Sequence, residues 1–479
     1  MIYKILIANR AEIAVRVIRA CRDLHIKSVA IFTEPDRECL HVKIADEAYR
    51  IGTDAVRGYL DVPRIIEVAK ACGADAIHPG YGFLSENYEF AKECEDAGII
   101  FIGPKADVIR KMGNKNIARY LMSKNGIPVV PGTEKLNNCT LDEIKHFAER
   151  IGYPVILKAS GGGGGRGIRV VYKEDELENS FESCKREALA FFNNDEVFME
   201  KYIENPRHIE IQILGDNYGH IIHLCERDCS IQRRHQKIIE IAPCPSISEN
   251  LRKTIGVTAI AAARAVGYSN AGTVEFLLDD YNHFYFMEMN TRIQVEHPIT
   301  EEVVGVDLVV RQIRIASGAI LDLEQSDIKA RGFAVEARIT AENVWKNFIP
   351  SAGKIGEYYP ALGPGVRVDS HIYKDYTIPP FYDSLLAKLI VKATSYDQVI
   401  NKLERALKEF VIDDVRTTIP FLIAITKIKE FRRGYFDTSF IETHMQEILE
   451  HTEDRHQENK EEVIAAIAAT LKKIRDTRK

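Results

Sequence analysis

Five polar residues in the segment 286–297 have side chains that could bind a metal, hold an anion and move a proton. They stand at every second position and are Glu288, Asn290, Arg292, Gln294 and Glu296. The residues between them are apolar except for Thr291. Strict alternation is typical of a strand with two different faces. We therefore expect a strand over 286–297 whose polar face carries this chemistry.

A second strand, predicted over 273–278, supplies another acid. Residues 279–283, which lie between the two predicted strands, include Asp and Asn residues that favour turns. In a hairpin symmetric about Tyr281 and Asn282, Glu275 falls opposite Glu288. Like charges facing each other are destabilising, and a divalent cation bound by both carboxylates would remove that cost. We predict a metal site here; the alternative is a solvated face with a tolerated acid pair.

The length of the first strand limits what its two end acids can do together. At about 3.3 Å per residue, a straight strand would hold Glu288 and Glu296 roughly 26 Å apart. Either the row bends after Arg292, or it forms an ordered track from metal to anion to base. The His297-Pro298 pair favours a bend just past Glu296.

A glycine-rich loop points to phosphate binding. A predicted strand over 154–158 ends at Lys158, and residues 161–167 contain six glycines and one arginine. The exposed N–H groups of such a loop can surround phosphate oxygens. No Gly-Lys-Ser/Thr follows, so it is not a Walker loop. The alternative is a flexible linker, but a second strand at 168–172 favours a lid that orders on nucleotide.

Three further segments suggest ligand contacts. A strand is expected over 197–203, and it runs into a linker between domains. Backbone donors and acceptors with apolar walls at such a place could bind an adenine. Two glycines flank Tyr81 in a loop after a predicted parallel strand, where α/β sheets bind ligands. The segment 226–240 gathers cations that suggest a phosphate or carbonate site, although a solvated charge cluster is the alternative. These cations are Arg227, Arg233, Arg234, His235 and Lys237.

The elements that position these groups indicate several domains. A strand at 5–7, a helix at 11–23 and a strand at 28–32 form a βαβ unit, which implies a parallel sheet. The turn 8–12 lacks G-x-G-x-x-G, which disfavours a nicotinamide oxidoreductase. A helix is expected over 305–317. A β-rich third domain then includes a strand at 332–339 with Arg338, a strand at 385–391 and a helix at 396–409. A final amphipathic helix is expected beyond residue 463.

The composition excludes some classes of protein. A chain of 479 residues is long enough for two to four domains. The net charge of -6 and a pI near 6.2 argue against a nucleic-acid binder. We expect neither a signal peptide nor a membrane span. Nine scattered cysteines without a CxxC motif favour a reduced, cytoplasmic protein.

Together, the motifs resemble the biotin carboxylase component of biotin-dependent carboxylases, in the ATP-grasp superfamily. The resemblance spans about 2–440 and rests on segments 7–14, 78–87, 158–167, 227–237 and 288–298. It implies an α/β (α+β) protein with a Rossmann-like N-terminal domain at 1–112. An ATP-grasp domain at 113–325 would include a glycine-rich lid at about 131–203. A C-terminal β-rich domain at 331–440 would precede a charged tail with an amphipathic helix at 441–479.

The resemblance also implies roles for individual residues. The implied ATP contacts are Lys115, Lys158, Gly164, Gly165, Glu200, Lys201, Tyr202, Ile203, His208, Gln232, His235, Glu275 and Glu288. The implied Mg²⁺ or Mn²⁺ ligands are Glu275, Glu288 and Asn290. Bicarbonate would be held by Lys237, Arg292, Gln294 and the Val295 backbone. Glu296 resembles the base, and the biotin contacts would be Tyr81, Gly82, Gln232 and the catalytic Arg338.

Two turns depart from the family pattern. Ala11 stands where the family usually has glycine, and residues 412–419 differ from the usual Gly-Val-x-Thr-Asn. Both lie away from the acidic hairpin and the glycine loop, so the predicted chemistry is not affected.

The implied activity is ATP-dependent carboxylation of biotin by bicarbonate, through carboxyphosphate. The biotinylated lysine of this family lies in Met-Lys-Met, which does not occur here. Biotin is therefore expected on a carrier protein or a biotinylated carboxyltransferase subunit, and the chain is expected to be a homodimer. Both acetyl-CoA and pyruvate are open as final acceptors, and the C-terminal helix favours pyruvate. The alternatives are another ATP-grasp carboxylate ligase and a non-catalytic nucleotide-binding subunit.

Overall fold

The structure, a computed structural model, describes residues 2–159, 167–192 and 195–453. The predicted glycine-rich loop, with Gly164 and Gly165, lies outside these residues except for its last glycine. The helix expected beyond residue 463 also lies outside them. Among the described residues, no helix is both long enough and apolar enough to cross a membrane.

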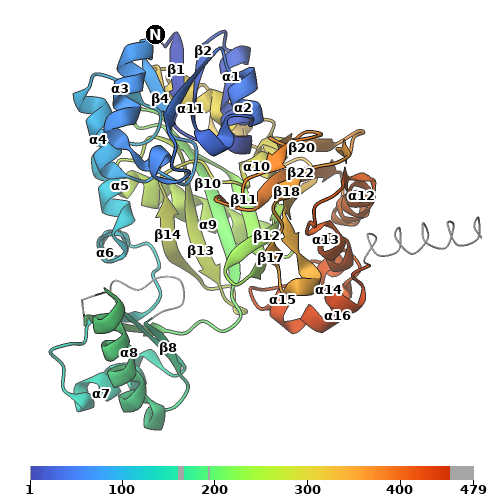
Figure 1. The fold of residues 1–479 in the computed structure, drawn as a ribbon. Helices are drawn as coiled ribbons and strands as arrows, with labels where there is room; N and C mark the ends of the chain where they lie inside the picture. Colours follow the sequence, from blue (N-terminus) through green and yellow to red (C-terminus); the bar gives the residue numbers. More distant parts are fainter. Residues whose placement is uncertain (1, 160–166, 193–194, 454–479) are drawn as a thin grey trace, which may run out of the picture.

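The N-terminal segment forms a parallel sheet of five strands, as its βαβ pattern predicts, with helices packed around it (Figure 1). The strand order is β3-β2-β1-β4-β5. The strands are β1 Lys4–Ile7, β2 Lys27–Thr33, β3 Glu47–Gly52, β4 Ala76–His78 and β5 Ile100–Phe101. The main helices are α1 Ala11–Asp23, α2 Leu40–Ile44, α3 Val62–Cys72, α4 Tyr88–Asp96, α5 Ala106–Gly113 and α6 Lys115–Lys124.

An eight-stranded antiparallel sheet runs through the middle of the molecule, in the order β14-β13-β10-β11-β12-β15-β22-β20. Its strands are β10 Arg207–Gly215, β11 Ile221–Arg233, β12 Gln236–Ala242, β13 Asn270–Leu278, β14 Phe284–Asn290, β15 Phe333–Thr340, β20 Val366–Ser370 and β22 Leu385–Ala393. Strand β12 pairs with β15. The central and C-terminal parts of the chain therefore share one sheet. Helices α9 Glu249–Ala265, α10 His297–Val304 and α11 Leu308–Ala316 belong to the central part.

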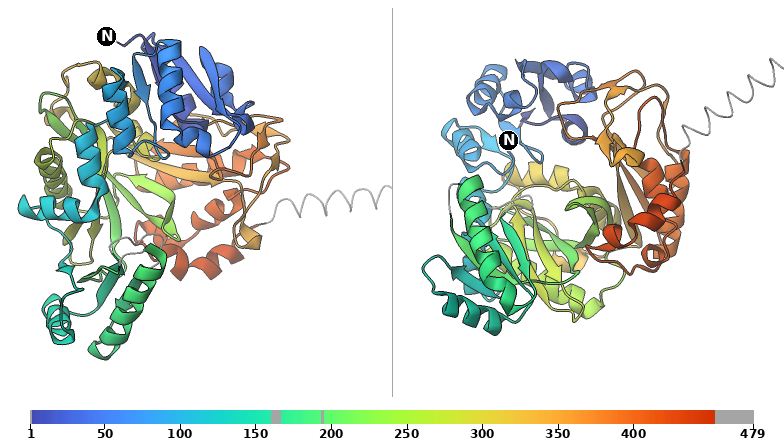
Figure 2. Two further views of the ribbon diagram at one scale, coloured as in Figure 1. Left: turned by 60° about the vertical axis from the view of Figure 1, so that its left-hand side comes forward. Right: turned by 60° about the horizontal axis from the view of Figure 1, so that its bottom comes forward.

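A small four-stranded sheet stands apart from the main body (Figures 1 and 2). Its order is β6-β9-β7-β8. The strands are β6 Gly132–Lys135, β7 Val155–Ala159, β8 Ile168–Val171 and β9 Val197–Lys201, with helices α7 Leu141–Ile151 and α8 Leu177–Phe192. It has an apolar core of its own, in which Ile144 and Ala148 of α7 contact residues such as Val155 and Leu157 of β7.

Helices and short strand pairs complete the C-terminal part (Figure 2). The helices are α12 Tyr396–Glu409, α13 Ile419–Ile425, α14 Lys429–Arg433, α15 Phe440–Thr443 and α16 Met445–Glu450. The short strands are β16 Glu342–Asn343, β17 Ile349–Pro350, β18 Gly353–Lys354, β19 Tyr358–Tyr359, β21 Thr377–Ile378 and β23 Val411–Ile412. The predicted strand at 385–391 and helix at 396–409 are both present.

The acidic hairpin forms, and Glu275 of β13 lies directly opposite Glu288 of β14, as predicted. The register next to the turn differs from the prediction, because Leu278 pairs with Phe284 and Phe276 with Phe286, which centres the turn on Tyr281. A bulge at Met287 then shifts the register by one residue and brings the two acids opposite each other.

The predicted strand over 286–297 is wrong beyond Asn290. Strand β14 ends there, residues 291–296 form a turn, and α10 begins at His297. The N–H of Thr291 donates to the carboxylate of Glu86 at 3.2 Å rather than to a neighbouring strand. Pro298, which suits the first turn of a helix, helps to start α10.

The helix predicted over 305–317 also differs. Gly305 has a left-handed φ of 72° and ends α10. Asp307 then caps α11 by accepting from the N–H of Val310. The helix therefore covers a shorter segment than its apolar periodicity indicates.

Ala11 has a φ of 56° at the start of α1. The left-handed region costs a residue with a Cβ about 1–2 kcal/mol, and glycine avoids that cost. Glycine is more flexible in the unfolded chain, which offsets part of the gain.

We predict that Ala11→Gly raises the free energy of unfolding by about 0.5–1 kcal/mol, as measured by urea denaturation. Ala14→Gly, in the same helix but with ordinary helical geometry, should lower it by about 1 kcal/mol. Equal destabilisation by both substitutions would contradict a strained backbone at Ala11.

Candidate functional site

One cavity of about 1580 Å³ collects the predicted site residues. Every residue to which the family resemblance assigns a role and that the structure describes lines it, namely Tyr81, Gly82, Lys115, Lys158, Glu200, Lys201, Tyr202, Ile203, His208, Gln232, His235, Lys237, Glu275, Glu288, Asn290, Arg292, Gln294, Val295, Glu296 and Arg338. Gly164 and Gly165 lie outside the described residues. The cavity extends from the small sheet, along the end of the acidic hairpin, to the N-terminal and C-terminal parts.

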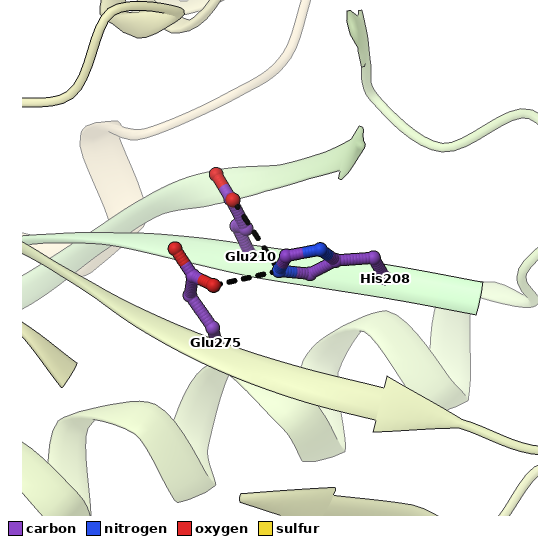
Figure 3. A group of neighbouring side chains, drawn as sticks. All are labelled: His208, Glu210 and Glu275. Atoms are coloured by element: carbon purple, nitrogen blue, oxygen red, sulfur yellow. Dashed lines mark hydrogen bonds and ion pairs between the residues drawn. The ribbon is translucent and has the colours of Figure 1, made fainter. Parts of the chain in front are cut away.

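The middle of the cavity is organised around the carboxylate of Glu275 (Figure 3). His208 Nε2 lies 2.7 Å from Glu275 Oε2 and 3.5 Å from Glu210 Oε1. The amides of Asn290 and Gln294 each donate to Glu275 Oε1 at 2.6 Å. The alternating polar residues of β10, β13 and β14 therefore meet at one carboxylate.

These contacts set opposite pKa shifts on the two acids of the hairpin. Burial would raise the pKa of Glu275, but Lys237 and His208 outweigh it and hold the pKa well below its usual value. Burial and the neighbouring Glu275 carboxylate raise the pKa of Glu288. Burial would lower the pKa of His208, but Glu275 raises it overall.

The donor set fits a hard divalent cation. Glu275 and Glu288 face each other across the hairpin, and oxygen ligands of this kind suit Mg²⁺ or Mn²⁺. The Asn290 side-chain oxygen accepts from Arg292 at 2.9 Å. Lys115 Nζ lies 3.8 Å from Glu288 and partly offsets its charge.

Five of the predicted nucleotide contacts lie on the small sheet or on the linker after it, namely Lys158, Glu200, Lys201, Tyr202 and Ile203. Lys158 of β7 pairs with Glu200 of β9 at 2.6 Å, and Arg119 also binds Glu200. Lys201 Nζ donates to the carbonyls of Gly152 and Tyr153 at 2.9 Å. Tyr202 and Ile203 follow β9 directly, and both line the cavity.

Arg292 is held in the turn that follows β14. Its Nε donates to Glu86 at 2.7 Å, and its Nη2 donates to Asn290. Because the strand has already ended, the side chain lies beside Asn290, one of the predicted metal ligands.

Glu296 lies between two cations. Its Oε1 is 2.7 Å from Lys237 Nζ, and its Oε2 is 3.0 Å from Arg338 Nη2. Burial alone would raise the pKa of Glu296, but Lys237 and Arg338 hold it well below its usual range. The side chain is therefore an ionised carboxylate at neutral pH. Arg338 also forms an ion pair with Glu240, at 2.6 Å.

The backbone around Val295 is fixed on both sides. His297 Nδ1 lies 2.7 Å from the carbonyl of Gln294. Lys388 Nζ, fully buried on β22, donates to the carbonyl of Val295 at 2.9 Å and pairs with Glu12 at 3.2 Å. The peptide planes before and after Val295 are thus held by α10 and by the C-terminal part of the sheet.

Tyr81 and Gly82 form the N-terminal wall of the cavity. The hydroxyl of Tyr81 donates to Glu12, and the side chain of Asn9 donates to the carbonyls of Pro79 and Tyr81 at 2.7 Å. Gly80 and Gly82 both have φ above 60°. The glycines beside Tyr81 are therefore required by the turn itself.

The basic run at 226–240 is not a helix, because it forms the β11–β12 hairpin, and its exposed residues Arg234, His235 and Gln236 lie at the turn. Lys237 and Gln232 reach the middle of the cavity. His235, in the exposed turn, lines its rim. The guanidinium of Arg233 stacks on Phe348 at 3.8 Å. Arg227 is fully buried among protein partners, so the expectation that it binds an anion is wrong.

Sequence reasoning missed five site residues, which are Glu12, Glu86, Glu210, Glu240 and Lys388. Glu210 had a visible signal, because it alternates with His208 and Gln212 along β10. Glu240 lies on β12 and Lys388 on β22, the two strands on either side of β15, and only the folded sheet reveals this arrangement.

Three family models match the chain in order. "Biotin carboxylase, N-terminal domain" matches residues 1–109. "Carbamoyl-phosphate synthase L chain, ATP binding domain" matches residues 114–324. "Biotin carboxylase C-terminal domain" matches residues 336–443.

Curated relatives match over nearly their whole length. Biotin carboxylase 1 of Bacillus subtilis is 53% identical over 447 residues, covering 93% of this chain and 99% of that protein. Biotin carboxylase of Haemophilus influenzae is 51% identical over 443 residues, covering 92% and 98%. The 2-oxoglutarate carboxylase small subunit of Hydrogenobacter thermophilus is 49% identical over 471 residues, covering 98% and 99%.

A solved structure agrees with these matches. The biotin carboxylase domain dimer of Hydrogenobacter thermophilus 2-oxoglutarate carboxylase, in complex with MgADP, ADP and bicarbonate, has a TM-score of 0.87 and 50% identity, covering 94% of this chain and 99% of that chain. On the fold, the family models and these relatives, the chain belongs to the biotin carboxylase family.

Proposed function

We propose that the chain uses ATP and bicarbonate to carboxylate biotin that is carried on a separate protein. The observation that supports this best is the ionised Glu296 between Lys237 and Arg338, in the same cavity as the acidic hairpin. A related structure that contains MgADP and bicarbonate also supports it.

At the nucleotide end, Glu275, Glu288 and Asn290 would hold the divalent cation, which neutralises phosphate charge when bound. Lys115 and Lys158 would contact the phosphates, since both residues line the cavity and the ammonium group of Lys115 lies 3.8 Å from Glu288. The linker residues 201–203 would form the adenine site through their backbone groups.

Bicarbonate would bind where Lys237, Arg292 and Gln294 converge, with the N–H of Val295 as a further donor. Arg292 offers a planar fork that matches a planar oxyanion. Glu296 removes the bicarbonate proton as a bicarbonate oxygen attacks the γ-phosphorus of ATP. The bond from that phosphorus to ADP breaks, which gives ADP and carboxyphosphate. Carboxyphosphate then separates into CO2 and phosphate.

Biotin would enter between the N-terminal and C-terminal walls, beside Tyr81, Gly82 and Gln232. Its N1′ must lose a proton before it attacks CO2, and the phosphate released from carboxyphosphate can accept that proton. The resulting enolate carries charge on the ureido oxygen. Arg338, fixed by Glu240 and Glu296, would stabilise that oxygen.

We predict that Glu296→Gln abolishes bicarbonate-dependent ATP hydrolysis, because an amide cannot take the proton. Nucleotide affinity should stay close to that of the unmodified chain, since Glu296 lies away from the small sheet. The measurements are phosphate release with and without bicarbonate, and ATP binding by calorimetry. Near-normal bicarbonate-dependent hydrolysis would exclude Glu296 as the base.

We predict that Arg338→Ala keeps slow bicarbonate-dependent ATP hydrolysis but loses carboxylation of free biotin. Removal of one transition-state donor should lower the carboxylation rate by about 100-fold or more. Incorporation of labelled bicarbonate into biotin is the readout. Unchanged carboxylation would exclude this role for Arg338. No carboxylation by the unmodified chain would favour the rival function, another ATP-grasp ligase with a different acceptor.

The carboxyl acceptor of the second half-reaction is proposed to be a 2-oxo acid. The match to the 2-oxoglutarate carboxylase small subunit extends over 471 residues, against 447 and 443 for the other two relatives.

We also propose that the chain works as a homodimer in the cytoplasm with a biotinylated partner. Affinity purification should recover a biotinylated carboxyltransferase subunit; recovery of an acetyl-CoA-specific carboxyltransferase instead would exclude a 2-oxo acid.

A further inference from the structure

Arg227 lies directly behind the proposed bicarbonate site. It is on β11 and is one of the largest side chains that are completely buried. Its guanidinium is surrounded by side chains from β10, β13, α10 and the turn 291–296. An arginine in such a position must be paired, because an isolated buried charge is very costly.

The partners of Arg227 are all acceptors. Nη1 donates to Gln212 Oε1 at 2.8 Å and to Thr300 Oγ1 at 3.0 Å. Nη2 donates to Thr273 Oγ1 at 3.1 Å and to Glu210 Oε2 at 3.2 Å. Nη2 also donates to Gln294 Oε1. The arginine therefore connects the sheet and α10 to a residue of the bicarbonate site.

The contact with Arg227 determines which way the Gln294 amide points. Arginine has only donors and an ionised carboxylate has only acceptors. The Gln294 oxygen must therefore face Arg227, while its nitrogen faces Glu275 Oε1 at 2.6 Å. An amide nitrogen carries two hydrogens, so one remains to donate to an anion in the cavity. With the amide reversed, both contacts would be repulsive.

Arg227 also acts on the second bicarbonate donor, through Glu210. One oxygen of Glu210 accepts from Arg227 and the other accepts from Lys237. Lys237 in turn lies 2.7 Å from Glu296. The guanidinium thus supports, from one buried position, both the amide of Gln294 and the ammonium of Lys237.

We propose that Arg227 is the positioning residue of the bicarbonate site, which orients the Gln294 amide so that its N–H donates to the anion. Arg227 does not touch bicarbonate itself. This inference rests on the proposed function, because it takes the anion in the cavity to be bicarbonate.

The test is the steady-state kinetics of bicarbonate-dependent ATP hydrolysis by the full chain. Arg227→Lys keeps the charge beside Glu210 but loses the planar fork that reaches Gln294. A charge-assisted hydrogen bond that is lost from the bound state should raise the KM for bicarbonate about tenfold or more. The KM for ATP should stay within about twofold, because Arg227 itself contacts none of the predicted nucleotide-binding residues.

Thr300→Val is the matched control. Thr300 accepts from the same guanidinium on the side away from Gln294, and valine has a similar shape. This variant should lose some thermal stability but keep the KM for bicarbonate within about twofold. If Arg227 were only structural, both variants would lose stability and neither would change the KM for bicarbonate selectively.

A double-mutant cycle tests the route through Gln294. In a Gln294→Ala background, Arg227→Lys should raise the KM for bicarbonate much less than it does alone, since residues in one network are not additive. Fully additive effects would overturn the proposal. So would an unchanged KM for bicarbonate in Arg227→Lys when the unmodified chain shows bicarbonate-dependent hydrolysis. If the unmodified chain shows none, the proposed function fails and the inference fails with it.

A structure of the unmodified chain with bicarbonate decides the question even if Arg227→Lys does not fold. The proposal requires the Gln294 amide to lie between Arg227 and the anion, within hydrogen-bond distance of both. A complex in which the Arg227–Gln294 contact is broken, or in which the anion binds elsewhere, would overturn it.

Discussion

The fold of this chain depends on the pairing of three buried carboxylates with one ammonium group. Glu210 and Glu296 contact Lys237 directly, and Glu275 lies 3.5 Å from it. They come from β10, from the turn before α10 and from β13. Carboxylates this deeply buried are tolerated only when they are paired. Strand β12, which carries Lys237, must therefore lie where it can reach all three, and this requirement fixes the turn 291–296 against the sheet.

The end of β14 at Asn290 has a direct effect on the chemistry. A longer strand would have carried Glu296 away from the acidic hairpin. Because the chain turns instead, Glu296 and Glu275 are both within reach of the same ammonium group. The proposed metal ligands, anion donors and base therefore lie in a single cavity, as a reaction between two anions, ATP and bicarbonate, requires.

The sequence predicted the parts of the site that depend on local patterns. Turn residues at 279–283 indicated the hairpin that carries Glu275 and Glu288, although a bulge at Met287, which the sequence did not indicate, is needed to bring the two acids opposite each other. Alternation could not show where β14 ends, because Thr291 bonds to Glu86, which is distant in the chain. Charge density suggested an anion near Arg227, whereas long-range packing gives that guanidinium five protein partners. Lys388 was not predicted, because its partners Glu12 and Val295 come from other parts of the chain.

The pairing of β12 with β15 also limits how the chain can be divided. A fragment that began near residue 331 would expose the whole edge of β15, and a fragment that ended before it would expose β12. Unpaired edges of this kind promote association between chains. The small sheet around β7 and β9 has its own core and is not joined to the main sheet. Exchange of segments between relatives should therefore be tolerated at the borders of the small sheet and should cause aggregation at the β12–β15 junction.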